Sequence, residues 1–180
     1  MKIAILGYSG AGKSTLAARL GKLHGLPVLH LDCVEFMPNW EKRKLDEKQR
    51  IAADFMCDND GWVIDGNYSK LFRAERLEQA NMIVMLLFNR FSCLWRAIKR
   101  YRSFKGKSRP DMGDGCIEKL DLEFIWWILH GGRIKKKKAD YKAIRDKYPD
   151  KVTVLKNQRQ LDEFLEHHKQ LGRSIEHDNG

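Results

Sequence analysis

"GYSGAGKST", residues Gly7–Thr15, is the most informative segment for the fold of this chain. The apolar segment "MKIAIL" at residues 1–6 comes before it, and Leu16, Leu20 and Leu23 follow it at helical spacing. A strand, a glycine-rich turn and a helix in this order provide the context that the pattern G-x-x-x-x-G-K-[ST] requires. We therefore predict a phosphate-binding loop between the first strand and the first helix.

The residue types in this loop suit a nucleotide. Glycines allow main-chain N–H groups to turn toward an anion without a side chain in the way, and the helix N-terminus adds partial positive charge. Lys13 is expected to contact the β- and γ-phosphates of ATP, and the Ser14 hydroxyl is expected to bind Mg²⁺. The predicted nucleotide-binding residues of the loop are Gly7, Ser9, Gly10, Ala11, Gly12, Lys13, Ser14 and Thr15.

The rest of the chain alternates short apolar segments with helical patterns. Strands are predicted at residues 26–32, 61–66, 81–88 and 151–156. Helices are predicted at residues 42–56, 69–79, 90–102, 116–130 and 133–147 and after Asn157, where Gln160 completes a capping box. This alternation is typical of an α/β fold, in which helices cover both faces of a parallel sheet. We predict a single domain over residues 1–170 and a disordered tail at 171–180.

Composition narrows the class of protein. A net charge of +10 predicts attraction to polyanions, and both nucleotides and nucleic acids qualify. No apolar run approaches the roughly 20 residues that a membrane span requires, and the N-terminus lacks the pattern of a signal peptide. The four cysteines are scattered, without the spacing of a zinc site or a disulfide framework; they are Cys33, Cys57, Cys93 and Cys116. We therefore expect a cytoplasmic protein without a membrane partner.

Two aspartates are expected at the carboxyl ends of neighbouring strands, where ligands gather in an open parallel sheet. Asp65 ends "WVID" and suits a contact to Mg²⁺ through water. Asp32 ends "VLHLD" and suits the acceptance of a proton from an acceptor hydroxyl. The alternative for either residue is a cap on the next helix or turn, where Asp is common.

A basic segment follows the fourth predicted strand. Arg96 and Arg100 lie four residues apart on one helix and therefore share a face, and Arg109 lies in the glycine-containing loop at 102–115. Such a loop can bring arginines to a transferring phosphoryl group and expel water as it closes. Against this stands the alternative of a solvated basic face. The predicted catalytic residues are Lys13, Asp32, Arg96, Arg100 and Arg109.

The run "RIKKKK" at Arg133–Lys138 has two interpretations. A solvated helix face is the simpler one, and contact with nucleic acid or polyphosphate is the other. Trp126 and Trp127 are expected to pack in the core or between helices. For Trp40, stacking on a planar acceptor and simple packing both remain open.

The phosphoryl group must go either to water or to a bound acceptor. A GTPase would carry an N-K-x-D motif, which the sequence lacks, and a motor ATPase needs a longer chain. A compact phosphate-loop protein with two strand-end aspartates and an arginine-bearing loop has the layout of a small-molecule kinase. Two alternatives stay open: a nucleotide-gated regulator associated with nucleic acid, and a slow ATPase without a small acceptor.

Four stretches together resemble the DNA topology modulation protein group, whose members are relatives of adenylate kinase. They are "GYSGAGKSTLAARL" from Gly7, "HLDCVEFMPNW" from His30, "WVIDGNYS" from Trp62 and "SRPDMGDGCIEKLDLEFIWWI" from Ser108. The resemblance covers residues 1 to about 166 and implies a three-layer P-loop NTPase fold of the nucleoside-monophosphate-kinase type. Its sheet would have five parallel strands in the order 2-3-1-4-5.

The same resemblance implies roles for particular residues. Arg96 and Arg100 would enter a short lid at about 102–115, in which Arg109 would be a lid cation, and Asn157 and Gln158 would lie along the adenine of ATP. One departure matters, because residues 32–61 show no clear segment for binding a nucleoside monophosphate. The acceptor of the expected ATP- and Mg²⁺-dependent kinase therefore stays open among nucleosides, nucleotides and other small metabolites.

Overall fold

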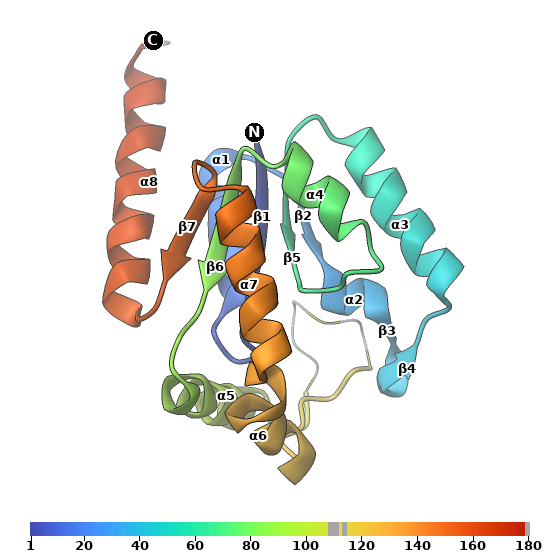
Figure 1. Ribbon diagram of the computed structural model, residues 1–180. Coiled ribbons are helices and arrows are strands. Elements are labelled where there is room, and N and C mark those ends of the chain that lie inside the picture. Colours follow the sequence, from blue (N-terminus) through green and yellow to red (C-terminus); the bar gives the residue numbers. More distant parts are fainter. Residues whose placement is uncertain (108–111, 113–114, 179–180) are drawn as a thin grey trace.

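A five-stranded parallel sheet forms the centre of the molecule (Figure 1). The computed structural model describes the backbone of residues 1–107, 112 and 115–178, and the side chains of these residues up to 170. The strands are β1 (Lys2–Gly7), β2 (Val28–His30), β5 (Trp62–Asp65), β6 (Met82–Leu86) and β7 (Val152–Leu155), and every neighbouring pair is parallel. Their order across the sheet is β2-β5-β1-β6-β7.

This order is the predicted one. The two remaining strands, β3 (Phe36–Met37) and β4 (Glu41–Lys42), form a separate antiparallel hairpin that the sequence did not predict. Counted without that hairpin, the strands of the large sheet lie in the order 2-3-1-4-5. The fold is therefore a three-layer α/β fold with a phosphate loop after its central strand.

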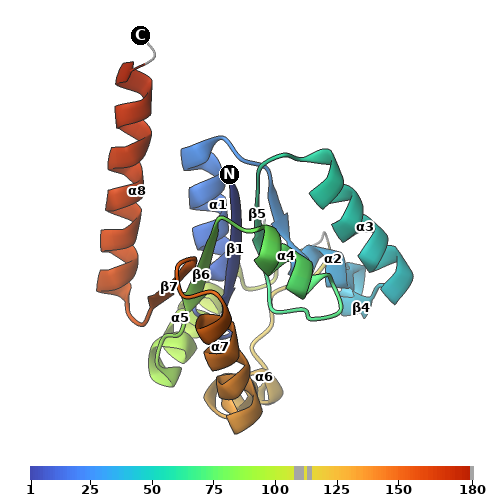
Figure 2. The same ribbon diagram turned by 45° about the horizontal axis from the view of Figure 1, so that its top comes forward.

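Alternate residues of the strands face opposite layers of helices. Along β1, Ile3 and Ile5 lie in the core beneath α1 (Lys13–His24) and α8 (Gln158–Asp178). Ala4 and Leu6 lie in the core on the other face, which three further helices cover; these are α3 (Leu45–Asp58), α4 (Arg73–Gln79) and α7 (Lys135–Lys147). Because both faces are buried, the strands are almost entirely apolar. Figure 2 shows α8 near the β7 edge of the sheet and α3 near the β2 edge.

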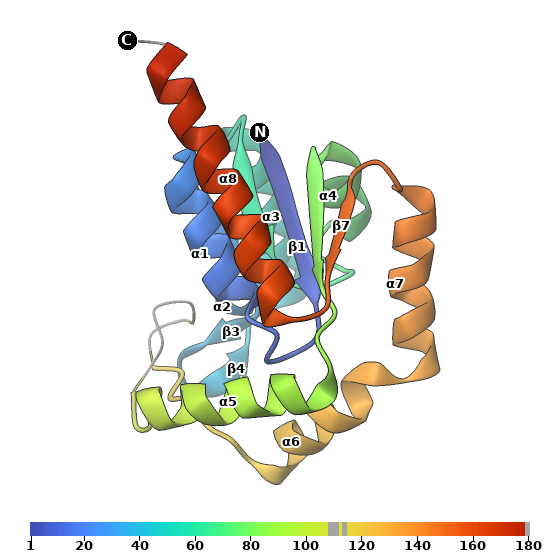
Figure 3. The ribbon, with the colours of Figure 1, turned by 90° about the vertical axis from the view of Figure 1, so that its left-hand side faces the viewer.

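Further helices cross below the carboxyl ends of the strands (Figure 3). They are α5 (Arg90–Phe104) and α6 (Leu122–Leu129), and a short 3-10 turn, η2 (Gly131–Arg133), joins α6 to α7. Side chains cap both helices, since Asn89 accepts a hydrogen bond from the Ser92 N–H at 2.8 Å and Asp121 accepts one from Phe124 at the same distance. These elements enclose the edge of the sheet where ligands collect in α/β proteins.

The capping box predicted at the start of the last helix is confirmed. The Asn157 side chain accepts a hydrogen bond from the Gln160 N–H at 2.9 Å, and Gln160 accepts one from the Lys156 N–H at 2.7 Å. Helix α8 continues through Asp178 and therefore extends into the segment that was expected to be a tail. In the part of the chain that the structure describes, no helix combines the length and apolar character that a bilayer crossing needs.

Two predicted elements have different bounds in the structure. The strand predicted at 26–32 ends at His30, and the chain then forms α2 (Leu31–Glu35). Leu31 and Val34 are both buried, and their spacing of three fits a helical turn. The helix predicted at 116–130 begins only at Leu122, after the Asp121 cap. Asp32 therefore lies in the first turn of a helix and not at a strand end.

Candidate active site

The phosphate loop has a backbone that only glycine adopts readily. Gly10 and Gly12 have φ values of 76° and 95°, in the left-handed region. A Cβ atom on Gly10 would lie 2.5 Å from the carbonyl oxygen of Cys93 in α5. Helix α5 therefore packs directly on the loop and holds its main chain in place.

The N-terminus of α1 is suited to an anion. Among the described residues, no side chain caps this helix at Gly12, and its first turn has no acidic residue. The main-chain N–H groups of a helix start then lack side-chain acceptors and can bind phosphate. The loop residues Ser9, Gly10, Gly12, Lys13, Ser14 and Thr15 all line one cavity of about 960 Å³. This arrangement fits the triphosphate of a nucleotide.

Two predicted loop residues do not line the cavity. Ala11 is fully buried in the core beside α1, and Gly7 ends β1. Both residues therefore support the loop from the side of the core and of β1. In the same loop the Lys13 ammonium donates a hydrogen bond to the Tyr8 carbonyl oxygen at 3.3 Å.

The two residues predicted to bind Mg²⁺ meet in the structure. The Ser14 hydroxyl donates a hydrogen bond to Asp65 Oδ2 at 3.1 Å, and Asp65 Oδ1 lies 2.5 Å from His30 Nδ1. Asp65 is only 3% exposed. Hydroxyl and carboxylate oxygens are ligands that Mg²⁺ prefers, usually with several waters and phosphate oxygens. Within the described residues there is no cluster of three or more His, Cys, Asp or Glu that could hold a metal.

Asn67 supports the phosphate loop and was missed in the sequence. Its amide donates to the Gly7 carbonyl oxygen at 2.7 Å and accepts from the Gly7 N–H at 3.1 Å. The Tyr141 hydroxyl also donates to Asn67 Oδ1 at 3.3 Å. Asn67 and Gly7 are 60 residues apart, so no local pattern could have linked them.

Asp32 lines the same cavity as Lys13 and Ser14. The Tyr68 hydroxyl, also in the cavity wall, donates a hydrogen bond to Asp32 Oδ1 at 2.6 Å. Burial, and after it the nearby Asp32 charge, raises the pKa of Tyr68 far above its usual value. Tyr68 therefore stays protonated and acts as a constant donor to Asp32. No local sequence pattern indicated this role of Tyr68.

Arg96 and Arg100 both line the cavity, as their shared helix face predicted. Arg96 lies against Gly12 of the loop, donates a hydrogen bond to Gln158 Oε1, and stacks over the Phe88 ring at 5.2 Å. Burial lowers the pKa of Arg96, but a guanidinium keeps its charge at neutral pH. Gln158 thus reaches the cavity, whereas its neighbour Asn157 caps α8 and is absent from the described lining.

Arg100 has a different environment from Arg96. Its Nε donates to Glu118 Oε1 at 2.8 Å, and the Glu118 side chain is only 2% exposed. Arg109 lies outside the described residues, as do 108, 110, 111, 113 and 114 of the predicted lid. Residues 102–104 of that lid belong to α5.

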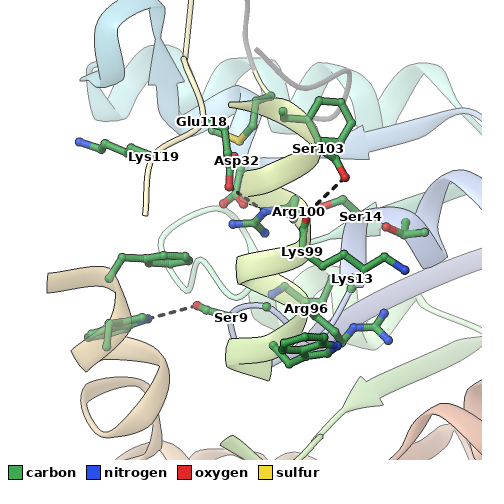
Figure 4. A pocket seen from close by; sticks show the side chains of 18 of the residues that line it. Ser9, Lys13, Ser14, Asp32, Arg96, Lys99, Arg100, Ser103, Glu118 and Lys119 are labelled. Carbon is green, nitrogen blue, oxygen red and sulfur yellow. Dashed lines mark hydrogen bonds and ion pairs between the residues drawn. The ribbon is translucent and has the colours of Figure 1, made fainter. Parts of the chain in front are cut away.

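Aromatic side chains form much of the cavity wall (Figure 4). The Trp40 indole donates to the Ile117 carbonyl oxygen at 2.9 Å and lies edge-to-face against Phe36, with 5.3 Å between centroids. Trp127 donates to the Ser9 hydroxyl at 3.2 Å. Trp126 and Trp127 are 59% and 42% exposed, so neither lies in the core, and the alternative of packing between helices stays a prediction. On the short helix α6 only Ile128 is buried.

The basic run divides into two parts. Arg133 points inward, where its guanidinium stacks on the Tyr8 ring at 3.8 Å and donates to the Phe88 carbonyl oxygen at 2.9 Å. The lysines begin α7, and Lys135, Lys136 and Lys138 are exposed. None of the run is among the described residues that line the cavity.

Comparison with known proteins finds a short sequence match. No family model matches the chain. A shikimate kinase from Flavobacterium johnsoniae is 44% identical over 48 residues, which are 26% of this chain and 28% of that protein. The match thus spans little more than a quarter of the relative's length.

Two solved structures with some likeness are kinases. A deoxyadenosine kinase from M. mycoides with bound dATP has a TM-score of 0.49 and 17% identity, with 100% of each chain covered. A shikimate kinase from Acinetobacter baumannii in complex with shikimate has a TM-score of 0.47 and 18% identity, covering 97% of this chain and 89% of that chain. The resemblance to the DNA topology modulation protein group is not confirmed by these matches and stays a prediction.

Proposed function

We propose that the protein is an ATP- and Mg²⁺-dependent phosphotransferase that acts on a small acceptor bearing a hydroxyl group. The observation that carries this proposal is the shared cavity of about 960 Å³, which the phosphate loop and Asp32 both line. A hydrolase requires room only for water beside the γ-phosphate. Here the cavity continues past the loop to a wall that contains Phe36, Trp40 and Tyr68, which is room for a second substrate.

The nucleotide would be held by the phosphate loop. Its main-chain N–H groups and Lys13 would bind the β- and γ-phosphates, and Gln158 would lie near the base. Ser14 and Asp65 would hold Mg²⁺. The bound ion would neutralise part of the negative charge on the phosphate oxygens. The hydrogen bond between Ser14 and Asp65 supports this pairing.

Asp32 would act on the acceptor. The acceptor oxygen forms a bond to the γ-phosphorus while the bond from that phosphorus to the departing ADP oxygen breaks, and the hydroxyl proton passes to the Asp32 carboxylate. Tyr68 holds one carboxylate oxygen of Asp32, which leaves the orientation of the group fixed. Arg96, Arg100 and Arg109 are the cations proposed to stabilise the transferring phosphoryl group.

The short match to a shikimate kinase supports the choice of a kinase, because that enzyme's name denotes transfer to a small hydroxyl compound. It leaves the acceptor of this chain open.

Acceptor-stimulated release of ADP tests the proposal. The purified full chain with ATP and Mg²⁺ is expected to release ADP slowly alone and much faster with a true acceptor. The panel should contain nucleosides, nucleoside monophosphates and small hydroxy acids. Equal ADP release with and without every acceptor would favour a slow ATPase, and a rate that rises only with DNA would favour the nucleic-acid-associated regulator.

A further inference from the structure

The charges around the cavity are divided between two halves (Figure 4). We call the part beside the phosphate loop, with Lys13 and Arg96, the nucleotide half. The acceptor half consists of Asp32, Phe36, Trp40, Tyr68, Arg100, Glu118 and Lys119, which the contacts described above and below join. In Figure 4 Lys13 and Arg96 lie toward one end of the view, and Asp32, Glu118 and Lys119 toward the other.

Acidic side chains form part of the cavity wall, and two of them belong to the acceptor half. Among the described residues that line the cavity, the acidic ones are Asp32, Glu118 and Asp121. Asp121 caps α6 next to Phe124, whose ring lies 5.8 Å from the Arg100 guanidinium. The nucleotide half therefore carries cations suited to a triphosphate, and the acceptor half balances Asp32 and Glu118 against Arg100 and Lys119. Lys99, which lies between Arg96 and Arg100 on α5, also lines the cavity.

The two cations of the acceptor half already have partners. Arg100 forms its ion pair with the buried Glu118 at 2.8 Å. The Lys119 ammonium lies 5.3 Å from the centroid of the Trp40 ring. The acceptor half therefore has no net positive charge to attract a phosphate or carboxylate, and Asp32 beside the acceptor hydroxyl would repel such a group.

The acceptor half also offers a fixed aromatic wall. Asn39 and Trp40 have φ values of 61° and 65°, a left-handed conformation that is costly for residues other than glycine. Contacts with the segment before α6 hold this turn, since the Asn39 N–H donates to the Gly115 carbonyl oxygen at 3.2 Å and Trp40 donates to Ile117. Strain that is maintained by surrounding contacts is often found where a side chain must be held for a ligand.

We propose that the acceptor is an uncharged alcohol that carries a flat ring, such as a nucleoside or an aryl alcohol, and that it is not a phosphomonoester or a hydroxy acid. This inference rests on the proposed function and narrows its acceptor. The ring packs against Trp40 and Phe36, and the hydroxyl faces Asp32. The reaction consumes ATP and the alcohol and yields ADP, the phosphate monoester and the proton that Asp32 accepts.

Matched pairs of acceptors test this inference with the unmodified protein. Each nucleoside is compared with its own 5′-monophosphate, and an aryl alcohol with the corresponding carboxylated alcohol. Because the acceptor half has no net positive charge and Asp32 repels an anion near the hydroxyl, the uncharged member should have a kcat/KM about tenfold higher in ADP release. A preference for the charged member would overturn the inference and leave phosphotransfer intact. No stimulation by any member, with ATP binding demonstrated separately, would overturn the inference and the proposed function together.

A variant pair tests the aromatic wall. Trp40→Ala should raise the acceptor KM about tenfold, because it removes a large ring contact, while the KM for ATP stays within about twofold. Trp40→Phe should restore most of the acceptor affinity. The control is Trp126→Ala, since Trp126 is exposed and is not among the described lining residues. If both Trp40 variants keep the original acceptor KM, Trp40 does not bind the acceptor and the inference is wrong.

Discussion

The two halves of the cavity are built in different ways. The nucleotide half comes largely from consecutive residues, Gly7–Thr15, whose main chain between β1 and α1 forms the binding surface. The acceptor half joins side chains from α2, the β3–β4 hairpin, α5 and the segment before α6. Changes in the first half should therefore affect every nucleotide-dependent step, whereas changes in the second should affect acceptor binding and transfer and leave ATP binding nearly unchanged.

Lys13→Ala is expected to have the largest effect. Loss of a charge aimed at the transferring group lowers kcat/KM by about 10³-fold or more, and ATP binding weakens strongly. Titration calorimetry with ATP and Mg²⁺ and the ADP-release assay measure the two effects. Lys135→Ala, at an exposed lysine of α7, is the matched control and should match the unmodified protein. Unchanged ATP binding in Lys13→Ala would remove the basis for the nucleotide half.

Asp32→Asn and Asp65→Asn separate the two halves. Asp32→Asn should lower kcat by about 10²-fold with little change in the Kd for ATP, because it removes a general base. Asp65→Asn should instead raise the Mg²⁺ concentration needed for half-maximal rate, because Asp65 contacts Ser14. Magnesium titrations of the rate for both variants make the comparison. The same Mg²⁺ dependence in both would mean that the halves are not separate.

Glu118→Gln should change acceptor selectivity. The change keeps the size of the side chain and removes the negative charge that pairs with Arg100. The ratio of kcat/KM for a monophosphate to that for its nucleoside should rise about tenfold, since the change removes one of the two carboxylates of the acceptor half and makes its net charge positive. Competition between the two acceptors measures this ratio directly. A falling ratio would show that Glu118 does not exclude anionic acceptors.

Tyr68→Phe should have the smallest effect, and one that does not vary with pH. Loss of the hydrogen bond to Asp32 should lower kcat/KM about fivefold to tenfold. Burial and the Asp32 charge raise the pKa of Tyr68, so the hydroxyl stays protonated as the pH rises through the neutral and mildly alkaline range. The ratio of the two rates should therefore be constant from about pH 7 to pH 9. A ratio that falls toward one at alkaline pH would show that Tyr68 ionises there.

Local sequence determined the fold class and the nucleotide half. The glycine spacing, Lys13 and Ser14 lie within one strand–loop–helix unit, and their geometry depends on main-chain angles that neighbouring residues set. The alternation of strands and helices likewise predicted a parallel sheet with both faces covered. Asp65 was correctly expected to end a strand, and the structure brings it to Ser14.

The acceptor half is assembled by tertiary packing and could not be predicted from local sequence. The Tyr68–Asp32 and Trp40–Ile117 hydrogen bonds join residues 36 and 77 positions apart. Asp32 itself lies on a helix because burial of Leu31 and Val34 outweighed the strand pattern that precedes it. Contacts of this kind depend on which strands become neighbours and on how α5 and α6 cross the sheet edge. A linear pattern contains the residues for such contacts but not the packing that brings them together.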